Sequence, residues 1–167
     1  MSEVAVVNAS PLIFLAKAGR LDLLRSIGAS RILVPAAVLM EVTAPGHLDA
    51  VARAVSAATW LEAVSVESIP PMVGAWDLGS GESAVVAAAL ARPGARAIID
   101  DLSGRRCALA VGVEVIGTLG VVIAAHRRGQ VIDPKELLLE LREHGMWLSD
   151  SVVERALQLA SEGRRSK

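Results

Sequence analysis

The sequence has little that would support a disulfide-stabilised or membrane-spanning protein. It contains one cysteine, Cys107, so no disulfide can form within the chain and a reducing compartment is expected. No uncharged apolar run approaches the roughly 20 residues of a membrane-spanning helix. The start of the chain, Met1-Ser2-Glu3, lacks the basic segment of a signal peptide. We therefore expect a cytoplasmic protein with no membrane partner.

Aromatic residues and net charge are also scarce. The 167 residues include one Phe, three Trp and no Tyr, and the formal net charge is -1. Such a shortage of aromatic side chains argues against a base-stacking surface of the kind that binds single-stranded nucleic acid. The balanced charge gives no overall positive field that would attract nucleic acid or an anionic membrane. A nucleic acid partner would have to be bound through local groups.

What the chain has in abundance is aliphatic side chains, in short runs that alternate with helical segments. Apolar residues make up 53% of the sequence, which is ample for one core, so we expect a single domain over residues 1–167. Strands are predicted at 4–7, 31–34, 97–99 and 113–116, with an ambiguous segment at 60–66. Helices are predicted at 10–17, 21–27, 35–42, 48–58, 82–91, 103–111, 117–128, 134–144 and 150–162.

This alternation of strands and helices predicts the fold class. Helical connections of this length favour βαβ units and a three-layer α/β/α sandwich around a mostly parallel sheet. The last helices begin at about residue 134, and a frayed tail is expected from about residue 163.

Two adjacent aspartates at the end of one predicted strand are the most informative feature of the chain. Asp100 and Asp101 follow the apolar run 97–99, and ligands of open α/β sheets bind beyond the carboxyl ends of the strands. Neighbouring carboxylates repel each other and are costly to desolvate without a cation or a proton. The pair therefore predicts a divalent metal ion at this edge of the sheet.

Three more oxygen-bearing side chains are predicted near the same edge. Asn8 follows the first strand, Glu41 lies on the helix after the second strand, and Glu82 opens an Ala-rich helix. Oxygen ligands favour Mg²⁺ or Mn²⁺, and the three histidines have no paired spacing that would indicate a zinc site. Taken singly, each residue is explained as a turn residue, a helix cap or a solvated charge. Their shared position after strands is what favours a metal site.

An ordered set of short motifs resembles the PIN-domain family. The motifs are Asn8-Ala9-Ser10-Pro11, Val34-Pro35 followed by Glu41, Gly81-Glu82, Asp100-Asp101 and Gly117-Thr118. Together they cover about residues 4–155, and they are most similar to a bacterial and archaeal PIN subgroup of poorly characterised function. The resemblance implies a PIN-like fold in which Asn8, Glu41, Glu82, Asp100 and Asp101 occupy the catalytic and metal-binding positions.

PIN domains are metal-dependent nucleases, and many small ones are VapC-type toxins that cleave RNA. The resemblance thus implies an endoribonuclease that uses Mg²⁺ or Mn²⁺, forms a homodimer and, as a toxin, is paired with an antitoxin protein. This chain departs from the family at Asn8, where most PIN domains have Asp, and an amide oxygen is a weaker ligand than a carboxylate. The alternative is therefore a catalytically weakened domain that binds RNA or protein.

Six residues are candidates for contacts with substrate. Ser10 and Thr118, both near helix starts, are placed to orient ligands or to touch phosphate oxygens. Arg105 and Arg106 are candidates for binding phosphate, as is the basic pair Arg127-Arg128. The simpler interpretations are helix capping and solvated surface charge.

Two other classes of protein fit the sequence less well. A receiver-like signalling domain needs its acidic pair early in the chain and a lysine after a late strand, and neither is present. A phosphate-binding loop of the P-loop type would end in Gly-Lys-Ser or Gly-Lys-Thr, whereas Gly79-Ser80-Gly81 is followed by Glu82, which would repel a phosphate.

Overall fold

A five-stranded parallel sheet forms the centre of the molecule. The computed structural model describes residues 3–46 and 49–162. The strands are β1 (Val4–Val7), β2 (Arg31–Pro35), β3 (Leu61–Val64), β4 (Arg96–Ile98) and β5 (Glu114–Ile116). Their order across the sheet is β3-β2-β1-β4-β5, and every neighbouring pair is parallel. β1 therefore lies in the middle, with strands added on both sides of it.

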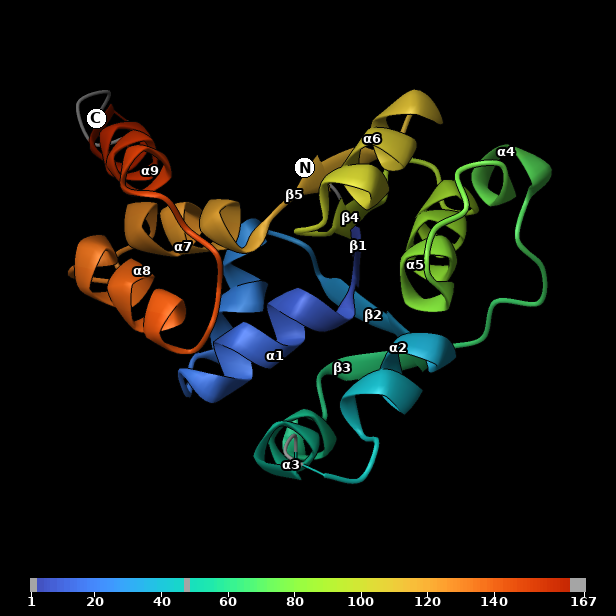
Figure 1. Cartoon of the computed structure of the whole chain (residues 1–167), viewed down its shortest axis with the longest axis horizontal. Helices are drawn as coiled ribbons and strands as arrows, with labels where there is room; N and C mark the ends of the chain where they lie inside the picture. Colours follow the sequence, from blue (N-terminus) through green and yellow to red (C-terminus); the bar gives the residue numbers. More distant parts are fainter. Residues whose placement is uncertain (1–2, 47–48, 163–167) are drawn as a thin grey trace.

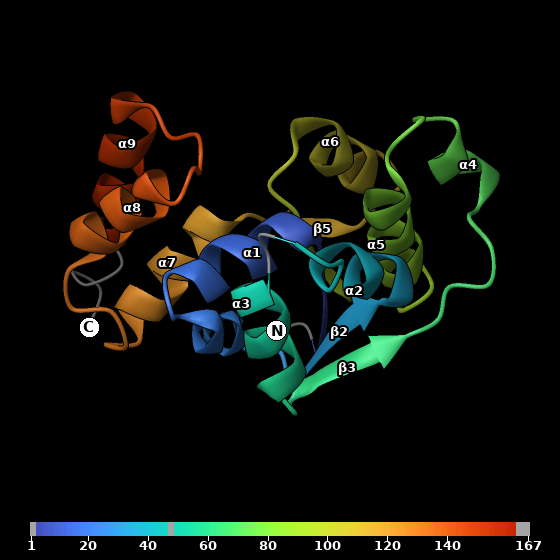
Figure 2. The same cartoon turned by 60° about the horizontal axis from the view of Figure 1, so that its bottom comes forward.

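Helices cover both faces of this sheet. They are α1 (Ala9–Lys17), η1 (Leu21–Ile27), α2 (Ala36–Val42), α3 (Asp49–Ala57), α4 (Pro71–Gly74), α5 (Ser80–Leu90), α6 (Leu102–Ala110), α7 (Thr118–Arg127), α8 (Pro134–Glu143) and α9 (Asp150–Glu162). Figure 1 and Figure 2 show α1, α7, α8 and α9 on one side of the strands and α4, α5 and α6 on the other. The predicted three-layer α/β/α sandwich is thus confirmed. None of the described helices is long and apolar enough to cross a bilayer.

Helix α5 is the element that fixes the geometry of the sheet edge. Nearly every side chain from Gly81 to Ala89 is buried, and a helix that is apolar on all sides must be surrounded by other elements. It contacts β1, β2 and β4, and also α2 and α6. Small side chains allow this close packing, and they hold the first turn of α5 beside the point where β1 and β4 end.

The observed elements follow the predicted ones closely, with four local differences. Helix α1 begins at Ala9, so Asn8 rather than Ser10 takes the N-cap position, although its side chain makes no capping hydrogen bond. Helix α5 begins at Ser80, two residues before the predicted start at Glu82. The ambiguous segment is the edge strand β3, and the short helix α4 was not predicted because its Pro-Pro start is typical of a loop. The tail from about residue 163 lies outside the described residues.

Candidate functional site

The candidate site lies where the central strands β1 and β4 end side by side. Asn8 follows β1, and its backbone N–H donates to the carbonyl of Ile98 at the end of β4 (3.0 Å). Ile99 continues the neighbouring ladder by donating to the carbonyl of Ile116 in β5 (2.9 Å), and the aspartate pair comes directly after it. Since the sheet is extended from β1 in both directions, this is its topological switch point, where open α/β sheets bind ligands.

Asn8, Glu41 and Glu82 converge at the first turn of α5. The Asn8 side chain is buried, and its amide Nδ2 donates a long hydrogen bond to Glu82 Oε1 (3.4 Å). A Cβ added at Gly81 would lie 3.2 Å from Glu41 Oε2 and 3.3 Å from Asn8 Oδ1. These two oxygens therefore face the same point of the helix, and the missing side chain of Gly81 leaves them the room to do so.

The amide oxygen of Asn8 is left without a donor. Asn8 Oδ1 is buried and accepts no hydrogen bond from any of the described residues. An unpaired buried acceptor costs about 1–3 kcal/mol, and native structures retain few of them. The nearest functional groups are the carboxylates of Glu41 and Glu82, which accept hydrogen bonds but cannot donate them when ionised. A cation would satisfy all three side chains at once.

Glu41 and Glu82 also interact electrostatically. Burial raises the pKa of the Glu41 carboxyl above its ordinary value, and the negative charge of Glu82 raises it further. Glu41 is nevertheless exposed on its outer side, so solvent screens part of this repulsion. A positive charge placed beside Glu41 would lower its pKa again, which is the response expected of a cation-binding position.

The two aspartates after β4 face different partners. Asp100 Oδ1 accepts from the backbone N–H of Thr118 (2.7 Å), and Asp100 Oδ2 accepts from the Thr118 hydroxyl (2.6 Å). Burial raises the pKa of Asp100, while the hydrogen bonds from Thr118 and the charge of Arg105 act to lower it. Asp101 is exposed and caps α6, since its Oδ2 accepts from the backbone N–H of Gly104 (2.9 Å).

Asp101, and not Asp100, lies on the Glu82 side of the site. A Cβ added at Gly104 would lie 3.4 Å from Glu82 Cγ and 3.8 Å from Asp101 Oδ2, so both side chains pass close to this glycine. Asp100 is held on the opposite side by its two hydrogen bonds from α7. The candidate acids therefore form two neighbouring groups rather than one.

The donor set suits a metal ion in its chemistry but is not drawn into one tight cluster. Within residues 3–46 and 49–162 there is no group of three or more His, Cys, Asp or Glu side chains placed to hold an ion. The five predicted ligands are thus not gathered into a single tight cluster. The oxygen set of Asn8, Glu41 and Glu82 fits a hard divalent cation in its chemistry, with an amide in place of one carboxylate and an unpaired oxygen directed at the shared space.

The residues predicted to contact substrate separate into three kinds. Ser10 and Arg105 line a groove of about 840 Å³ that also includes the aspartate pair. Thr118 is fully buried and its hydroxyl is used by Asp100, so it positions a carboxylate and does not reach a phosphate. Arg106 is exposed on α6 but does not line the groove, so the structure does not bring it to the site.

The far wall of this groove was missed by the sequence analysis. It is made by the segment before α9 and by α9 itself, with Trp147 and Arg155 among its side chains. The scarcity of aromatic residues argued against a stacking surface, but a low count does not show where each residue lies, and one of the three tryptophans lines this groove. The apolar triplet Met146-Trp147-Leu148, directly before a helix, was the available signal.

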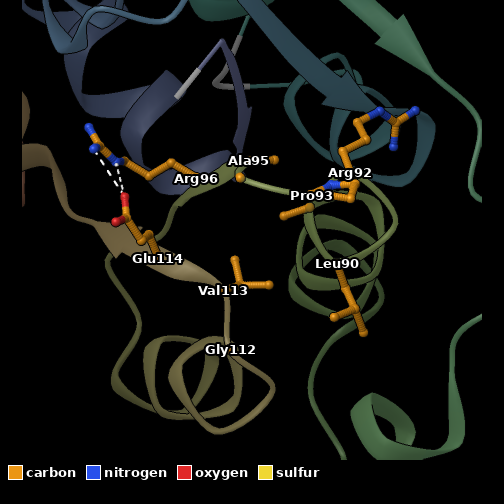
Figure 3. Close-up of a pocket in the computed structure, with 10 residues that line it drawn as sticks. Leu90, Arg92, Pro93, Ala95, Arg96, Gly112, Val113 and Glu114 are labelled. Carbon is orange, nitrogen blue, oxygen red and sulfur yellow. Dashed lines mark hydrogen bonds and ion pairs between the residues drawn. The ribbon is translucent and has the colours of Figure 1, made fainter. Parts of the chain in front are cut away.

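A second cavity, of about 310 Å³, opens at the opposite edge of the sheet, beside the amino ends of β4 and β5 (Figure 3). Arg96 on β4 and Glu114 on β5 are in register there and form an ion pair (3.1 Å). Arg92 Nη1 donates to the carbonyl of Ala88 (2.7 Å). The charged groups of this cavity are partnered within the chain, so it offers no candidate site.

A parallel sheet with carboxylate and amide side chains at its switch point defines the general class, an α/β protein with a candidate site beyond its strand ends. The family model described as DUF3368, a PIN domain, matches residues 4–162. The chain therefore belongs to the PIN-domain family. No curated protein and no solved structure matches it. PIN domains are generally nucleases that use divalent metal ions, so the fold is of the nuclease type.

Proposed function

We propose that this PIN domain is a metal-dependent endoribonuclease that uses Mg²⁺ or Mn²⁺. The observation that carries the proposal is the unpaired Oδ1 of Asn8, which is buried and faces Glu41 Oε2 across Gly81. A buried acceptor surrounded by carboxylates lacks a positive partner, and a divalent cation is the partner that suits an all-oxygen set. Asn8, Glu41 and Glu82 would hold the ion, with Asp101 at the rim.

A bound divalent ion would neutralise phosphate charge and lower the pKa of an attacking water. The chain's own residues divide the remaining tasks. Asp100, held by two hydrogen bonds from Thr118, is a fixed acceptor that can orient a water molecule or receive its proton. Arg105 donates through Nη1 to the carbonyl of Ile99 (3.0 Å), and this contact holds its positive charge at the groove wall, where it can bind a phosphate. This division of roles supports phosphodiester hydrolysis.

Cleavage of labelled RNAs and single-stranded DNAs in Mg²⁺, Mn²⁺ or EDTA tests the proposal. The site variant is Glu41→Gln/Asp101→Asn, and the matched control is Glu62→Gln/Asp133→Asn. The control removes the same two charges elsewhere, and Asp133 caps α8 as Asp101 caps α6. We expect metal-dependent RNA cleavage that falls at least about a hundredfold in the site variant and is unchanged in the control. Full cleavage by the site variant would refute the site, and cleavage of DNA alone would refute the ribonuclease assignment.

The finer biological role that we propose is that of a toxin, by resemblance to the VapC-type proteins. A toxin of this kind acts as a homodimer and is held inactive by an antitoxin protein. Induced expression of the wild-type chain should then arrest growth, and Glu41→Gln/Asp101→Asn should not. A monomeric mass in light scattering at micromolar concentration would contradict the homodimer.

A second candidate function is a binding module without turnover. The observation that favours it is Asn8 itself, because the amide removes one negative charge from the group that would hold the ion. Such a module would bind RNA or protein and would cleave no nucleic acid in the presence of either metal. Turnover that depends on metal and on Glu41 would exclude it.

A further inference from the structure

The groove beside the aspartates leads away from the candidate reaction centre to the C-terminal helices. Asp100, Asp101 and Arg105 line one part of it, and Trp147 and Arg155 line another. Helix α9, which carries Arg155, packs against α7, and α7 begins at the candidate site. The groove is therefore one continuous surface between the acidic residues and the far wall.

The side chain of Trp147 is exposed to solvent, whereas the residues on either side of it in the sequence are buried. It lies in the connection between α8 and α9, where Met146 and Leu148 are each only 8% exposed. Trp147 between them is 88% exposed. Because both neighbours are packed in the core, the backbone at Trp147 is held in place, and the indole lies at the groove. A large, exposed aromatic side chain on a preformed groove is a feature of binding surfaces.

Positive charge accompanies this indole along the groove. Arg155 Nη1 donates to the neutral Oε1 of Gln158 (3.1 Å), and no carboxylate forms an ion pair with Arg155 among the residues that the structure describes. Arg105 lies in the same groove nearer the acids. The carboxylates lining the groove, within the described part of the chain, are those of Asp100 and Asp101. This arrangement complements a polyanion that has one phosphate at the acidic end and others along the arginines.

We propose that Trp147 and Arg155 form a nucleotide subsite for a single-stranded nucleic acid, next to the reaction centre. One base stacks on the indole, and an adjoining phosphate pairs with the guanidinium. The inference rests on the proposed function, because that function places the scissile phosphate at the acidic end of the groove. A segment of a partner protein would also suit apolar walls, but it would not require an arginine without a carboxylate partner in the same groove as an exposed indole. Stacking on an indole accepts any base, so the subsite contributes affinity with little sequence preference.

Binding of a fluorescein-labelled single-stranded RNA of ten nucleotides, measured by anisotropy in EDTA, tests the subsite without turnover. We expect Trp147→Ala to weaken binding about tenfold, within the range for loss of one stacked base, and Trp147→Phe to retain most of the affinity. Arg155→Gln should weaken binding and lower the salt dependence by about one charge. Trp76→Ala and Arg53→Gln remove the same residue types outside the groove and should bind RNA as the wild type does.

Tryptophan fluorescence provides a readout that a purely structural role would not move. The variant Trp60→Phe/Trp76→Phe leaves Trp147 as the single tryptophan. Addition of the unlabelled RNA should quench its emission, because a stacked base is in contact with the ring. Unchanged emission at saturating RNA would overturn the proposal. Thermal unfolding of Trp147→Ala should match that of the wild type, since the side chain is exposed.

Failure of the subsite and failure of the nuclease assignment give different results. If Trp147→Ala and Arg155→Gln bind and cleave RNA as the wild type does while Glu41→Gln/Asp101→Asn is inactive, the subsite is refuted and the nuclease site stands. If RNA binding requires Trp147 and Arg155 but no metal supports cleavage, the subsite stands on a binding module. If the RNA is not bound and only a partner protein quenches Trp147, the groove is a protein-binding surface and the proposal is wrong.

Discussion

The two ends of the parallel sheet differ in how their charged residues are paired. At the amino end, charges on neighbouring strands are paired. Arg31 on β2 lies 2.6 Å from Glu62 on β3, and Arg96 on β4 lies 3.1 Å from Glu114 on β5. Exposed pairs of this kind contribute only about 0–1 kcal/mol each, but each of them places a cation next to a carboxylate.

At the carboxyl end the balance is missing. Glu41 and Glu82 repel each other, and among the described residues neither forms an ion pair with a cation. The buried amide oxygen of Asn8 beside them has no donor. The sheet thus has a balanced amino end, where the strands carry ion pairs, and an unbalanced carboxyl end, where Asn8, Glu41 and Glu82 have no positive partner within the part of the chain that the structure describes. Uncompensated polar groups concentrated at one position are what a binding or catalytic site requires, since the ligand supplies the missing charge.

The largest effect that would sharpen this contrast is expected from Glu82→Gln. The substitution keeps the shape and the acceptor oxygen but removes one negative charge from the group of Asn8, Glu41 and Glu82. We expect metal-dependent cleavage to fall about tenfold to a hundredfold. Glu136→Gln is the matched control, because Glu136 also lies in the first turn of a helix and is remote from the site. Equal activity of the two variants in a cleavage time course would show that the charge of Glu82 at the unbalanced end is not needed for cleavage.

Gly81→Ala fills the space between the two facing oxygens and should have the next largest effect. The new methyl group would lie 3.2 Å from Glu41 Oε2 and 3.3 Å from Asn8 Oδ1, so both must shift by a few tenths of an ångström. We expect about a tenfold loss of cleavage, while alanine's better helix propensity keeps the thermal midpoint the same or higher. Gly74→Ala, at a glycine with nothing within 4 Å, should change neither quantity. Loss of fold in Gly81→Ala, with unchanged specific activity of the folded fraction, would argue against a ligand between these oxygens.

Asn8→Asp restores the acidic residue usual in the family and should change how stability depends on metal. Without metal, a carboxylate replaces the amide that donates to Glu82 Oε1, so repulsion lowers the thermal midpoint. With Mg²⁺ or Mn²⁺, the added charge strengthens binding, and the metal-induced rise in midpoint should exceed that of the wild type by several degrees. Differential scanning fluorimetry with and without EDTA measures both. Identical responses of Asn8→Asp and the wild type would mean that the ion does not bind next to this residue.

How far the sequence predicts this contrast can be judged from particular residues. The strands and nearly all the helices were predictable because their signals are local: an aliphatic run such as 4–7, followed by a proline-containing helix start. The position of the unbalanced end was also predictable, since parallel strands end at one edge. Neither the pairing of Arg31 with Glu62 nor that of Arg96 with Glu114 was predicted, because both depend on strand register.

The division of labour within the site depended on long-range packing. Successive side chains along a strand face opposite ways, but the partner that fixes Asp100 is Thr118, on a helix after the next strand. Burial of Met146 and Leu148 decides that Trp147 is exposed, and this burial follows from the placement of α8 and α9 against α7. Sequence spacing does not determine such contacts between elements.

The smallest effect, and the one that addresses both ends of the sheet together, is the pH dependence of stability in EDTA. Burial and the charge of Glu82 raise the pKa of Glu41 above its ordinary 4.5, so the folded state binds this proton more readily than the unfolded state does. The contribution of Glu41 to stability therefore falls as the pH rises above about 4.5. The hydrogen bond from Arg31 lowers the pKa of Glu62, so its contribution is present above 4.5 and is lost as the pH falls through the lowered value.

The two signs can be separated by subtraction. The difference in unfolding free energy between wild type and Glu41→Gln should decrease as the pH rises above about 4.5. The difference between wild type and Glu62→Gln should increase as the pH rises from acid toward about 4.5. Mg²⁺ should flatten or reverse the first slope, because a bound cation stabilises the ionised carboxylate, and should leave the second unchanged. Chemical denaturation at several pH values measures both differences. If the first slope has the same sign as the second in EDTA, folding does not raise the pKa of Glu41. If Mg²⁺ does not alter the first slope, no cation binds next to Glu41 at the carboxyl end of the sheet.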